Sequence, residues 1–587
     1  MSSFLLLWRY LKTVGPYRPL IKIAVILMII WTIINFLPPW IIMVLIDDAL
    51  PRQDLTLLNI LVIMQLFIIC NNQFMGAVKG FIYTYLQQNV NLDLNLKLFD
   101  HVMTLPVQFF NSNDTGSLVH RFMQDVTQTR ELTATILIDV MVHLATLLML
   151  LGVLFYINVK LALICLGIAA IYAVNVNIFK NRIYGAAKDI GERTGELYAL
   201  LYQIIPGVRE VKSLQLSKYV QKLYASGLIK FFRANVTNYR LGVYVGLIAE
   251  ILRPLAWAII IAVGGREVIK GSLSIGSLLA FANYLDRIYG PINGLSGLYS
   301  EIQRVVPAME RVATVLDTKS EFNTFKGQRL LMNDVKGHIV LKAVGFGYLK
   351  DKPVEKNINM DINPGSKVAI VGPSGCGKST LAHLILRFYD VSSGSIYLDG
   401  INIKQINLPN YRRQVGLIPQ GIKLFSASIK DNILMGDRHA PMERVIDAAK
   451  AAHAHEFIMD LPEGYETLYG EKGVFLSGGE SQRVVIARSV LQNPRVLILD
   501  EATSSVDANS EALIQDSINK LSSNRTTIVI AHRFSTIIDA NWIYVMDRGM
   551  IIAEGTHQTL LKDSSLYASL YQKQIRENIL EEFSYAT

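Results

Sequence analysis

Apolar residues form long unbroken segments in the first half of the chain and short alternating ones in the second. Six of the long segments are close to the roughly 20 residues that a helix needs to cross a bilayer. They lie near residues 21–45, 57–80, 133–157, 161–179, 243–264 and 275–298. This pattern predicts six transmembrane α-helices, the first of them kinked at Pro38 and Pro39 because proline removes a backbone hydrogen bond.

The connections between these segments are alternately short and long. Those near 81–132 and 180–242 are long but contain few turn-forming residues, which predicts that the helices continue well beyond the membrane. Residues 180–242 carry eleven lysines and arginines. The short connections carry only Arg52, Lys160, Arg266 and Lys270. Because basic loops remain in the cytoplasm, the long extensions and both chain ends are expected there, with the helices in the cell membrane.

The second half of the chain has the pattern of a soluble α/β domain. After a polar connecting segment near 300–335, short β-rich runs at 338–345 and 367–371 are separated by glycine turns and helical segments. Strands and helices alternate in this way when helices cover a largely parallel sheet.

The composition agrees with a membrane protein joined to such a domain. Of the 587 residues, 51% are hydrophobic and 18% charged, which excludes a disordered chain. A net charge of +9 would suit nucleic acid, but it equally suits the basic loops of a membrane protein. The long apolar segments therefore argue against a nucleic-acid partner. The three cysteines, Cys70, Cys165 and Cys376, have no regular spacing, so neither a disulfide framework nor a zinc site is indicated.

The densest chemistry lies at residues 372–380, GPSGCGKST, which fit the pattern G-x-x-x-x-G-K-[ST]. The motif follows the strand-like KVAIV and precedes the apolar LAHLILRFY, the context that a phosphate-binding loop requires. Its glycines let backbone N–H groups approach phosphate oxygens, and the helix that follows favours the negative charge. We expect Lys378 to reach the β- and γ-phosphates of ATP and Ser379 to bind Mg²⁺.

Two further strand-like segments end in polar residues. Residues 496–499 precede Asp500, expected to position Mg²⁺, and Glu501, expected to activate the attacking water. A turn-capping role is the alternative for Glu501. Residues 527–530 precede His532. Because parallel strands bring their carboxyl ends to one edge of a sheet, His532 is expected to reach the γ-phosphate.

The order of these motifs resembles that of ATP-binding-cassette (ABC) transporters. The phosphate loop is followed by Gln420 in IPQGIKLF, by the signature LSGG within residues 476–479, by LILDE, by SSVD and by His532. The chain is similar over essentially its whole length to an exporter-type half-transporter. The resemblance implies a membrane protein with six transmembrane α-helices that have long cytoplasmic extensions, followed by an α/β P-loop ATPase domain.

The resemblance implies five divisions of the chain. These are an interfacial helix over 1–20, a transmembrane domain over 21–312, a linker over 313–336, a nucleotide-binding domain over 337–575 and a tail over 576–587. Short coupling helices are expected near 108–117 and 204–213, at the tips of the long extensions.

The resemblance also implies roles for individual residues. Tyr348 would stack on adenine, although an aromatic residue here could equally belong to the core. Gln420 would contact Mg²⁺ and the attacking water, and Asp507 would link the two ATP sites of a dimer. The residues expected to bind nucleotide within one chain are Gly372, Ser374, Gly375, Gly377, Lys378, Ser379 and Thr380. Ser477, Gly478 and Gly479 would bind the γ-phosphate held by a second half-transporter.

Three residues depart from the family's usual pattern. Glu480 stands at the fifth position of the signature, where glutamine is commoner, and Ser481 follows it where arginine is frequent. Gly421 follows Gln420 where an acid is usual. None of these departures removes a group that hydrolysis needs, so both composite sites of a homodimer would be competent. A heterodimer with another half-transporter stays open.

Ionisable and polar residues within the spans are candidates for a substrate cavity, because charge is costly in a membrane. Asp139 and His143 are four residues apart, Glu250 and Arg253 three apart, and each pair can share a helix face. The alternative for each pair is a structural lock between helices. Polar residues of the last span, Asn283 and Tyr284, could join the cavity. We expect an amphipathic substrate, exported by an ATP-driven pump. A lipid flippase and an ATP-regulated channel of the same architecture are the alternatives.

Overall fold

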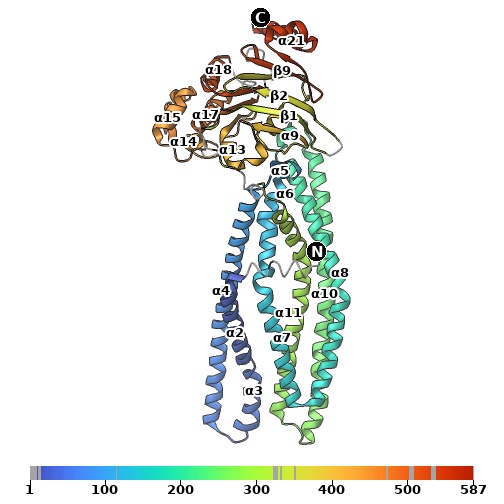
Figure 1. The fold of residues 1–587 in the computed structure, drawn as a ribbon. Coiled ribbons are helices and arrows are strands. Elements are labelled where there is room, and N and C mark those ends of the chain that lie inside the picture. The colour runs from blue at the N-terminus through green and yellow to red at the C-terminus, as the bar shows by residue number, and fades with distance from the viewer. Residues whose placement is uncertain are drawn as a thin grey trace. The chain divides into compact units, whose positions relative to one another are not determined.

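The chain folds into two compact units in the computed structural model shown in Figure 1. The helical unit comprises Met1–Met103 and Asn113–Thr318, and the sheet unit comprises Thr104–Ser112 and Lys319–Thr587. The division after Thr318 falls within the expected linker. The structure describes residues 10, 15–113, 115–321, 328–330, 334–349, 352–470, 473–500, 508–530 and 537–585. Most of the expected interfacial helix over 1–20 lies outside these residues.

The described part of the helical unit consists of helices and short turns (Figure 1). Its longer helices are α2 (Arg18–Asn35), α4 (Leu55–Val102), α7 (Val126–Ile157), α8 (Val159–Ile204), α10 (Ser217–Ile269) and α11 (Ile275–Asp317). Its shorter ones are η1 (Gly15–Tyr17), α3 (Leu37–Val44), η2 (Leu45–Ala49), α6 (Thr115–His120), η3 (Arg121–Asp125) and α9 (Val208–Ser213). α4, α8 and α10 confirm that the helices continue far beyond the predicted spans.

Local sequence explains where several of these helices begin and end. Pro38 and Pro39 separate α2 from α3 at Phe36, as predicted. The Asp54 side chain caps α4 by accepting hydrogen bonds from the backbone N–H groups of Thr56 and Leu57. Asn158 caps α8 in the same way, which allows the short turn between α7 and α8.

Among the described residues, five helical stretches are long and apolar enough to cross a membrane. They are Gly15–Ala49, Leu55–Val102, Ile138–Ile157, Val159–Ile204 and Ser217–Ile269. The sixth expected span forms the first part of α11, which is a continuous helix but carries Asp286 and Arg287 there. The count of six therefore stays a prediction.

The described residues of the sheet unit form two sheets (Figure 1). The larger has the order β10-β9-β3-β8-β7-β6, and its strands are β3 (Lys367–Val371), β6 (Val415–Ile418), β7 (Val496–Asp500), β8 (Thr526–Ile530), β9 (Trp542–Asp547) and β10 (Met550–Gly555). All of its pairs are parallel except β9 with β10. The smaller, antiparallel sheet joins β1 (Ile339–Phe346), β2 (Glu355–Ile362), β4 (Ser393–Leu398) and β5 (Ile401–Asn402). These strands confirm the predicted α/β domain.

The helices of the sheet unit cover these strands and complete its core. They are α5 (Val107–Ser112), α12 (Lys378–Ile385), η5 (Ile403–Gln405), α13 (Leu408–Gln414), α14 (Ile429–Leu434), α15 (Met442–Ala451), α16 (His455–Met459), η6 (Gly464–Glu466), α17 (Gly478–Gln492), α18 (Ala508–Ser522), α20 (His557–Asp563) and α21 (Ser565–Tyr585). α21 continues through the expected tail as far as Tyr585. Apolar residues of β3, β7, β8 and β9 lie in the two hydrophobic clusters on either side of the larger sheet.

An ion pair between a buried acid and a half-exposed arginine joins two segments of the helical unit that are far apart in sequence. Asp125, the last residue of η3, is fully buried. Arg311 of α11 donates to it twice, with Nε 2.8 Å from Oδ2 and Nη2 2.7 Å from Oδ1. Such two-pronged pairing satisfies a buried carboxylate that would otherwise be costly.

We expect Arg311→Gln to lower the stability of the helical unit by about 3 kcal/mol, because it leaves the buried charge of Asp125 without its guanidinium. Arg52→Gln is the matched control, since Arg52 pairs with Asp48 at the surface, where such pairs contribute about 1 kcal/mol or less. Thermal unfolding of both variants in lipid nanodiscs measures the difference. Equal unfolding temperatures for the two variants would show that the buried pair contributes no more than the exposed one.

Candidate nucleotide site and membrane polar residues

The predicted phosphate loop joins β3 to α12, as the sequence indicates. Gly375 and Gly377 adopt φ values of +80° and +116°, which favour glycine because other residues are strained there. Gly377 is the N-cap of α12, so the first N–H groups of that helix have no acceptor within it. The buried Lys378 ammonium donates to the carbonyls of Gly372 at 2.8 Å and Pro373 at 3.0 Å.

Parallel pairing brings the other expected catalytic segments to the edge where this loop lies. β3 and β7 both pair with β8, and Asp500 at the end of β7 is opposite Ile530 at the end of β8. Gln420 follows β6, which pairs with β7. Three further predicted residues, Glu501, Asp507 and His532, lie outside the described residues.

The residues at this edge fit a nucleoside triphosphate with Mg²⁺. A Cβ on Gly375 would meet nothing within 4 Å, so the loop backbone is open to a ligand. The described residues contain no group of three or more His, Cys, Asp or Glu side chains that could hold a metal ion. Mg²⁺ commonly takes one or two protein oxygens together with phosphate oxygens, and Ser379, Gln420 and Asp500 are the side chains expected to supply them.

The signature segment caps the start of α17. The Ser477 hydroxyl accepts a hydrogen bond from the Glu480 N–H at 3.3 Å, and the Glu480 carboxylate accepts one from the Ser477 N–H at 2.8 Å. This reciprocal arrangement is a capping box, which glutamate and glutamine can both form. The unusual Glu480 therefore keeps the helix start intact.

Tyr348 belongs to a cluster of aromatic side chains. Its ring centroid lies 5.0 Å from that of Phe346 and 5.2 Å from that of Tyr389. Its hydroxyl lies 3.2 Å from the Thr380 hydroxyl in the phosphate loop. Tyr389 in turn accepts a hydrogen bond from Asn111 of α5. The cluster thus connects the phosphate loop with the first expected coupling helix.

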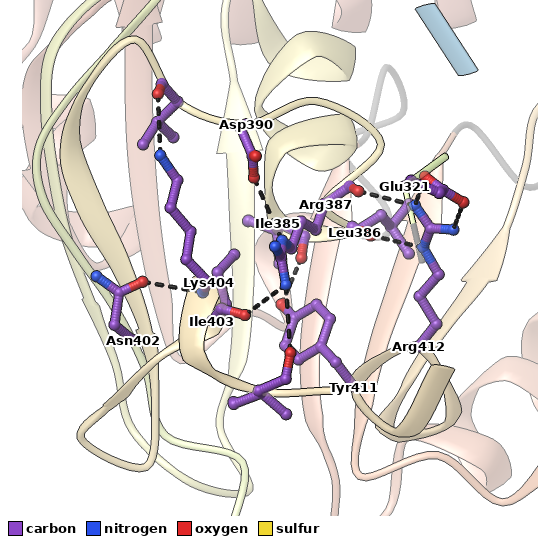
Figure 2. A network of polar contacts seen from close by, with 12 residues as sticks. Glu321, Ile385, Leu386, Arg387, Asp390, Asn402, Ile403, Lys404, Tyr411 and Arg412 are labelled. Atoms are coloured by element: carbon purple, nitrogen blue, oxygen red, sulfur yellow. Dashed lines mark hydrogen bonds and ion pairs between the residues drawn. The ribbon is translucent and has the colours of Figure 1, made fainter. Parts of the chain in front are cut away.

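A second polar network within the sheet unit includes Glu321 and Arg412 (Figure 2). Arg412 forms a two-pronged ion pair with Glu321 at 2.7 and 3.1 Å, as Figure 2 shows. The backbone N–H of Glu321 donates to the carbonyl of Thr104 at 2.9 Å. A cavity of about 220 Å³ lies beside this contact and is lined in part by Pro106, Gln108 and Glu321.

Asp139 in the helical unit lies in a polar cluster that joins α4 and α7. Tyr83 of α4 donates to Asp139 at 2.6 Å, and the Lys79 ammonium lies 3.9 Å from the same carboxylate. His143, one turn further along α7, lies against Gly294 of α11, where a Cβ would come within 2.3 Å of its Nε2. The structure thus brings Asp139 to partners that the sequence did not identify.

The other candidates for the substrate cavity have different surroundings. Arg253 lies over the ring of Tyr289 at 5.8 Å, and Glu250 is exposed on α10. Asn283 donates to the Leu279 carbonyl of its own helix. Tyr284 is buried and donates to the carbonyl of Phe36, so it packs between α11 and the break before α3 rather than lining a cavity.

Comparison with known families agrees with this geometry. Residues 21–292 match the family model of the ABC transporter transmembrane region, and residues 355–504 match the family model described as ABC transporter. The chain belongs to the ABC transporter family. It is a multi-pass membrane transporter whose ATPase is coupled to transport, and the predicted family and fold are confirmed.

Two curated relatives and one solved structure cover nearly the whole transporter. A protein of Bacillus subtilis named as a multidrug export ATP-binding/permease protein is 34% identical over 96% of this chain and 98% of its own length. A protein of Staphylococcus aureus that is also named as a multidrug export ATP-binding/permease protein is 35% identical over 96% of this chain and 99% of its own length. The structure of a bacterial Atm1-family ABC exporter with ATP bound is 27% identical, with a TM-score of 0.85 over 95% of this chain and 98% of that one.

Several residues of the transporter's sites carried no sequence signal. Tyr389 and Glu321 contact the segment Thr104–Ser112, and Arg412 pairs with Glu321. Lys79 and Tyr83 could have been noticed, because a lysine inside an apolar segment is unusual. Their partner Asp139 lies more than fifty residues away, so the pairing itself needed the structure.

We expect Gly377→Ala to impair nucleotide binding by the transporter more than Gly375→Ala does. Both add left-handed strain of about 1–2 kcal/mol, or roughly tenfold in affinity. A Cβ at Gly377 would also lie 2.4 Å from Oε1 of Glu355, whereas one at Gly375 meets open space. Binding of a fluorescent ATP analogue and the unfolding temperature measure both effects. Combining Gly377→Ala with Glu355→Ala should recover part of the loss, and no recovery would contradict the proposed clash.

Proposed function

We propose that two copies of this chain form an exporter that hydrolyses ATP at two shared sites and moves an amphipathic compound outward across the cell membrane. The supporting observation is that one chain carries a formed phosphate loop and a capped signature helix, joined to a bundle of apolar helices. The names of its relatives, which refer to multidrug export, favour a drug-like or natural-product substrate.

The two phosphate-binding segments belong to different parts of the sheet unit. The phosphate loop follows β3 at the centre of the larger sheet, whereas α17 packs with α14, α15 and α18. We infer that each ATP is held by Lys378, Ser379 and Thr380 of one copy and by Ser477, Gly478 and Gly479 of the other. Both copies then contribute to each site, head to tail.

The proposed cycle depends on the γ-phosphate. Contacts from both copies to that group favour the closed dimer, and hydrolysis removes them, as a ligand-driven two-state change requires. Mg²⁺, held by Ser379, Asp500 and Gln420, would neutralise phosphate charge. Glu501 would accept a proton from the attacking water, and His532 would hold the γ-phosphate.

The aromatic cluster offers a route from the nucleotide to the helices. Adenine stacked on Tyr348 would lie on a ring that packs edge to face against Phe346 and Tyr389. Tyr389 is hydrogen-bonded to Asn111 in α5, so a movement of the Tyr348 ring would be passed to the segment between α4 and α6. We infer that closure of the sheet units changes which side of the membrane the helical bundle opens to.

The cluster of Lys79, Tyr83 and Asp139 is the proposed polar contact for substrate. The Asp139 side chain keeps 21% of its surface exposed and that of Lys79 keeps 34%, so neither is sealed in the core. The accessible Asp139 carboxylate would attract the cationic end of an amphipathic molecule, in competition with the Lys79 ammonium 3.9 Å away.

The proposed ATPase mechanism is tested by Glu501→Gln. This variant should lose turnover but still close on ATP, because it keeps every group that binds the phosphates. Lys378→Ala should lose both turnover and closure, since it removes the charge that reaches the β- and γ-phosphates. Phosphate release and the distance between spin labels on the two sheet units are the measurements. Normal phosphate release by Glu501→Gln would exclude Glu501 as the base.

The proposed substrate contact is tested by Asp139→Asn. Losing a charge-assisted contact should weaken the apparent affinity with which a cationic amphiphile such as ethidium stimulates the ATPase by about tenfold. Tyr83→Phe should have a smaller effect, and Asp48→Asn, at an exposed pair with Arg52, should have none. Stimulation titrations in proteoliposomes give the comparison. If Asp139→Asn lowers thermal stability and leaves stimulation unchanged, the cluster is only a lock between α4 and α7.

A further inference from the structure

Glu355 is a buried carboxylic acid that the proposed ATPase mechanism does not use. It is the first residue of β2 and is 1% exposed. Strict alternation from the buried Ile358, Met360 and Ile362 would turn Glu355 outward. The pairing register of β1 with β2 shifts between Ile358 and Glu355, and Asn357 in that interval has a φ of +53°. This bulge turns Glu355 to the buried face.

The Glu355 carboxyl lies directly behind the phosphate loop. A Cβ on Gly377 would be 2.4 Å from its Oε1 and 3.3 Å from its Oε2, so the carboxyl is in contact with that glycine. Backbone bonds hold the arrangement: Lys356 N–H donates to the carbonyl of Gly549, and Gly549 N–H donates to that of Cys376, at 2.8 and 3.0 Å. Neither strand nor loop can shift without breaking this ladder.

Neither Glu355 carboxyl oxygen has a hydrogen-bond partner within the part of the chain that the structure describes. Burial raises the pKa of Glu355 from its ordinary value of 4.5 to about 8. Among the described residues, the titratable and charged groups on the elements packed around it are Cys376 and Lys378 of the loop, Asp547 at the end of β9, Arg548 after it, and Lys356 of β2. The Lys378 ammonium is turned to the carbonyls of Gly372 and Pro373, so it does not neutralise the acid by pairing.

We propose that Glu355 links nucleotide binding to proton binding, because the phosphate loop accepts phosphate only when this acid is neutral. The inference rests on the phosphate loop proposed above. An ionised carboxylate against Gly377 would place a negative charge behind the N–H groups that face the phosphate. In a buried site such repulsion is weakly screened. By reciprocity, bound phosphate raises the affinity of Glu355 for its proton.

Linkage fixes the sign and the limit of the effect. Below pH 8 Glu355 is mostly neutral, and the loop binds phosphate at full affinity. Above pH 8 Glu355 must take up a proton before phosphate binds, which weakens binding. If only the neutral form binds, the Kd rises by about tenfold between pH 7 and pH 9. In the same range, phosphate groups with a second pKa near 6 are already ionised.

The test measures MgADP binding to the full-length protein by calorimetry at pH 7, 8 and 9. MgADP occupies the phosphate loop and is not hydrolysed. We expect the wild-type Kd to rise several-fold to about tenfold. The Kd of Glu355→Gln and that of Glu355→Leu should change less than about twofold over this pH range, since neither side chain can ionise. Cys376→Ser should keep the wild-type pH dependence of the Kd, which excludes the neighbouring thiol as the group that causes it.

Proton uptake gives a second readout that needs no variant. Titrations at pH 8 in two buffers of different ionisation enthalpy should show net uptake of protons by the wild type on binding MgADP, and none by Glu355→Leu. A wild-type Kd that is flat from pH 7 to 9, or a dependence that Glu355→Gln and Glu355→Leu share, would overturn the inference. Absence of MgADP binding at every pH would instead overturn the proposed phosphate loop.

Discussion

The parallel pairing of β7, β8 and β3 is the interaction on which the proposed chemistry depends. Its hydrogen bonds set Asp500 beside Ile530 and place the end of β8 next to the start of the phosphate loop. Side chains that lie more than a hundred residues apart in sequence thereby meet at one sheet edge. The loop itself adds only backbone donors and one lysine. A slip of the ladder by one residue would turn every following side chain to the other face.

The helical unit is organised by a different constraint, the cost of charge in an apolar environment. Asp125 is satisfied by the fork of Arg311, and Asp139 by Tyr83 and Lys79. In the pair of Asp125 with Arg311 the acid is buried, and the pair holds η3 to α11. In the cluster around Asp139 the acid stays partly exposed, which suits a site that exchanges ligands rather than one that only fixes helices.

Sequence predicted those features that depend on neighbouring residues. Apolar length predicted the five helices that are long enough to cross a membrane, and Pro38 and Pro39 predicted the break at Phe36. The motif with its flanking strand and helix predicted the phosphate loop. Each of these features is encoded within about twenty residues. The α/β domain followed from the alternation of strands and helices, and the family from the order of the motifs.

Features that depend on distant contacts could not be predicted. Glu321 pairs with Arg412, which lies about ninety residues away in sequence. The bond between Asn111 and Tyr389 requires the segment Thr104–Ser112 to fold with the sheet unit. Tyr284 was a candidate for a polar cavity, but its buried hydroxyl donates a hydrogen bond to the carbonyl of Phe36. Glu355 follows a pattern that predicts an outward side chain, and only the bulge at Asn357 reverses it.

The central claim, that each ATP is shared between two copies, is tested most directly by mixing two inactive variants. Lys378→Ala and Ser477→Arg each damage both sites of their own homodimer. A mixed dimer has one site with both defects and one fully intact site. With each variant carrying its own affinity tag, we expect purified mixed dimers to trap about one nucleotide per dimer in the presence of vanadate, whereas either homodimer traps none. Mixed dimers that trap no more nucleotide than the homodimers would contradict the shared site.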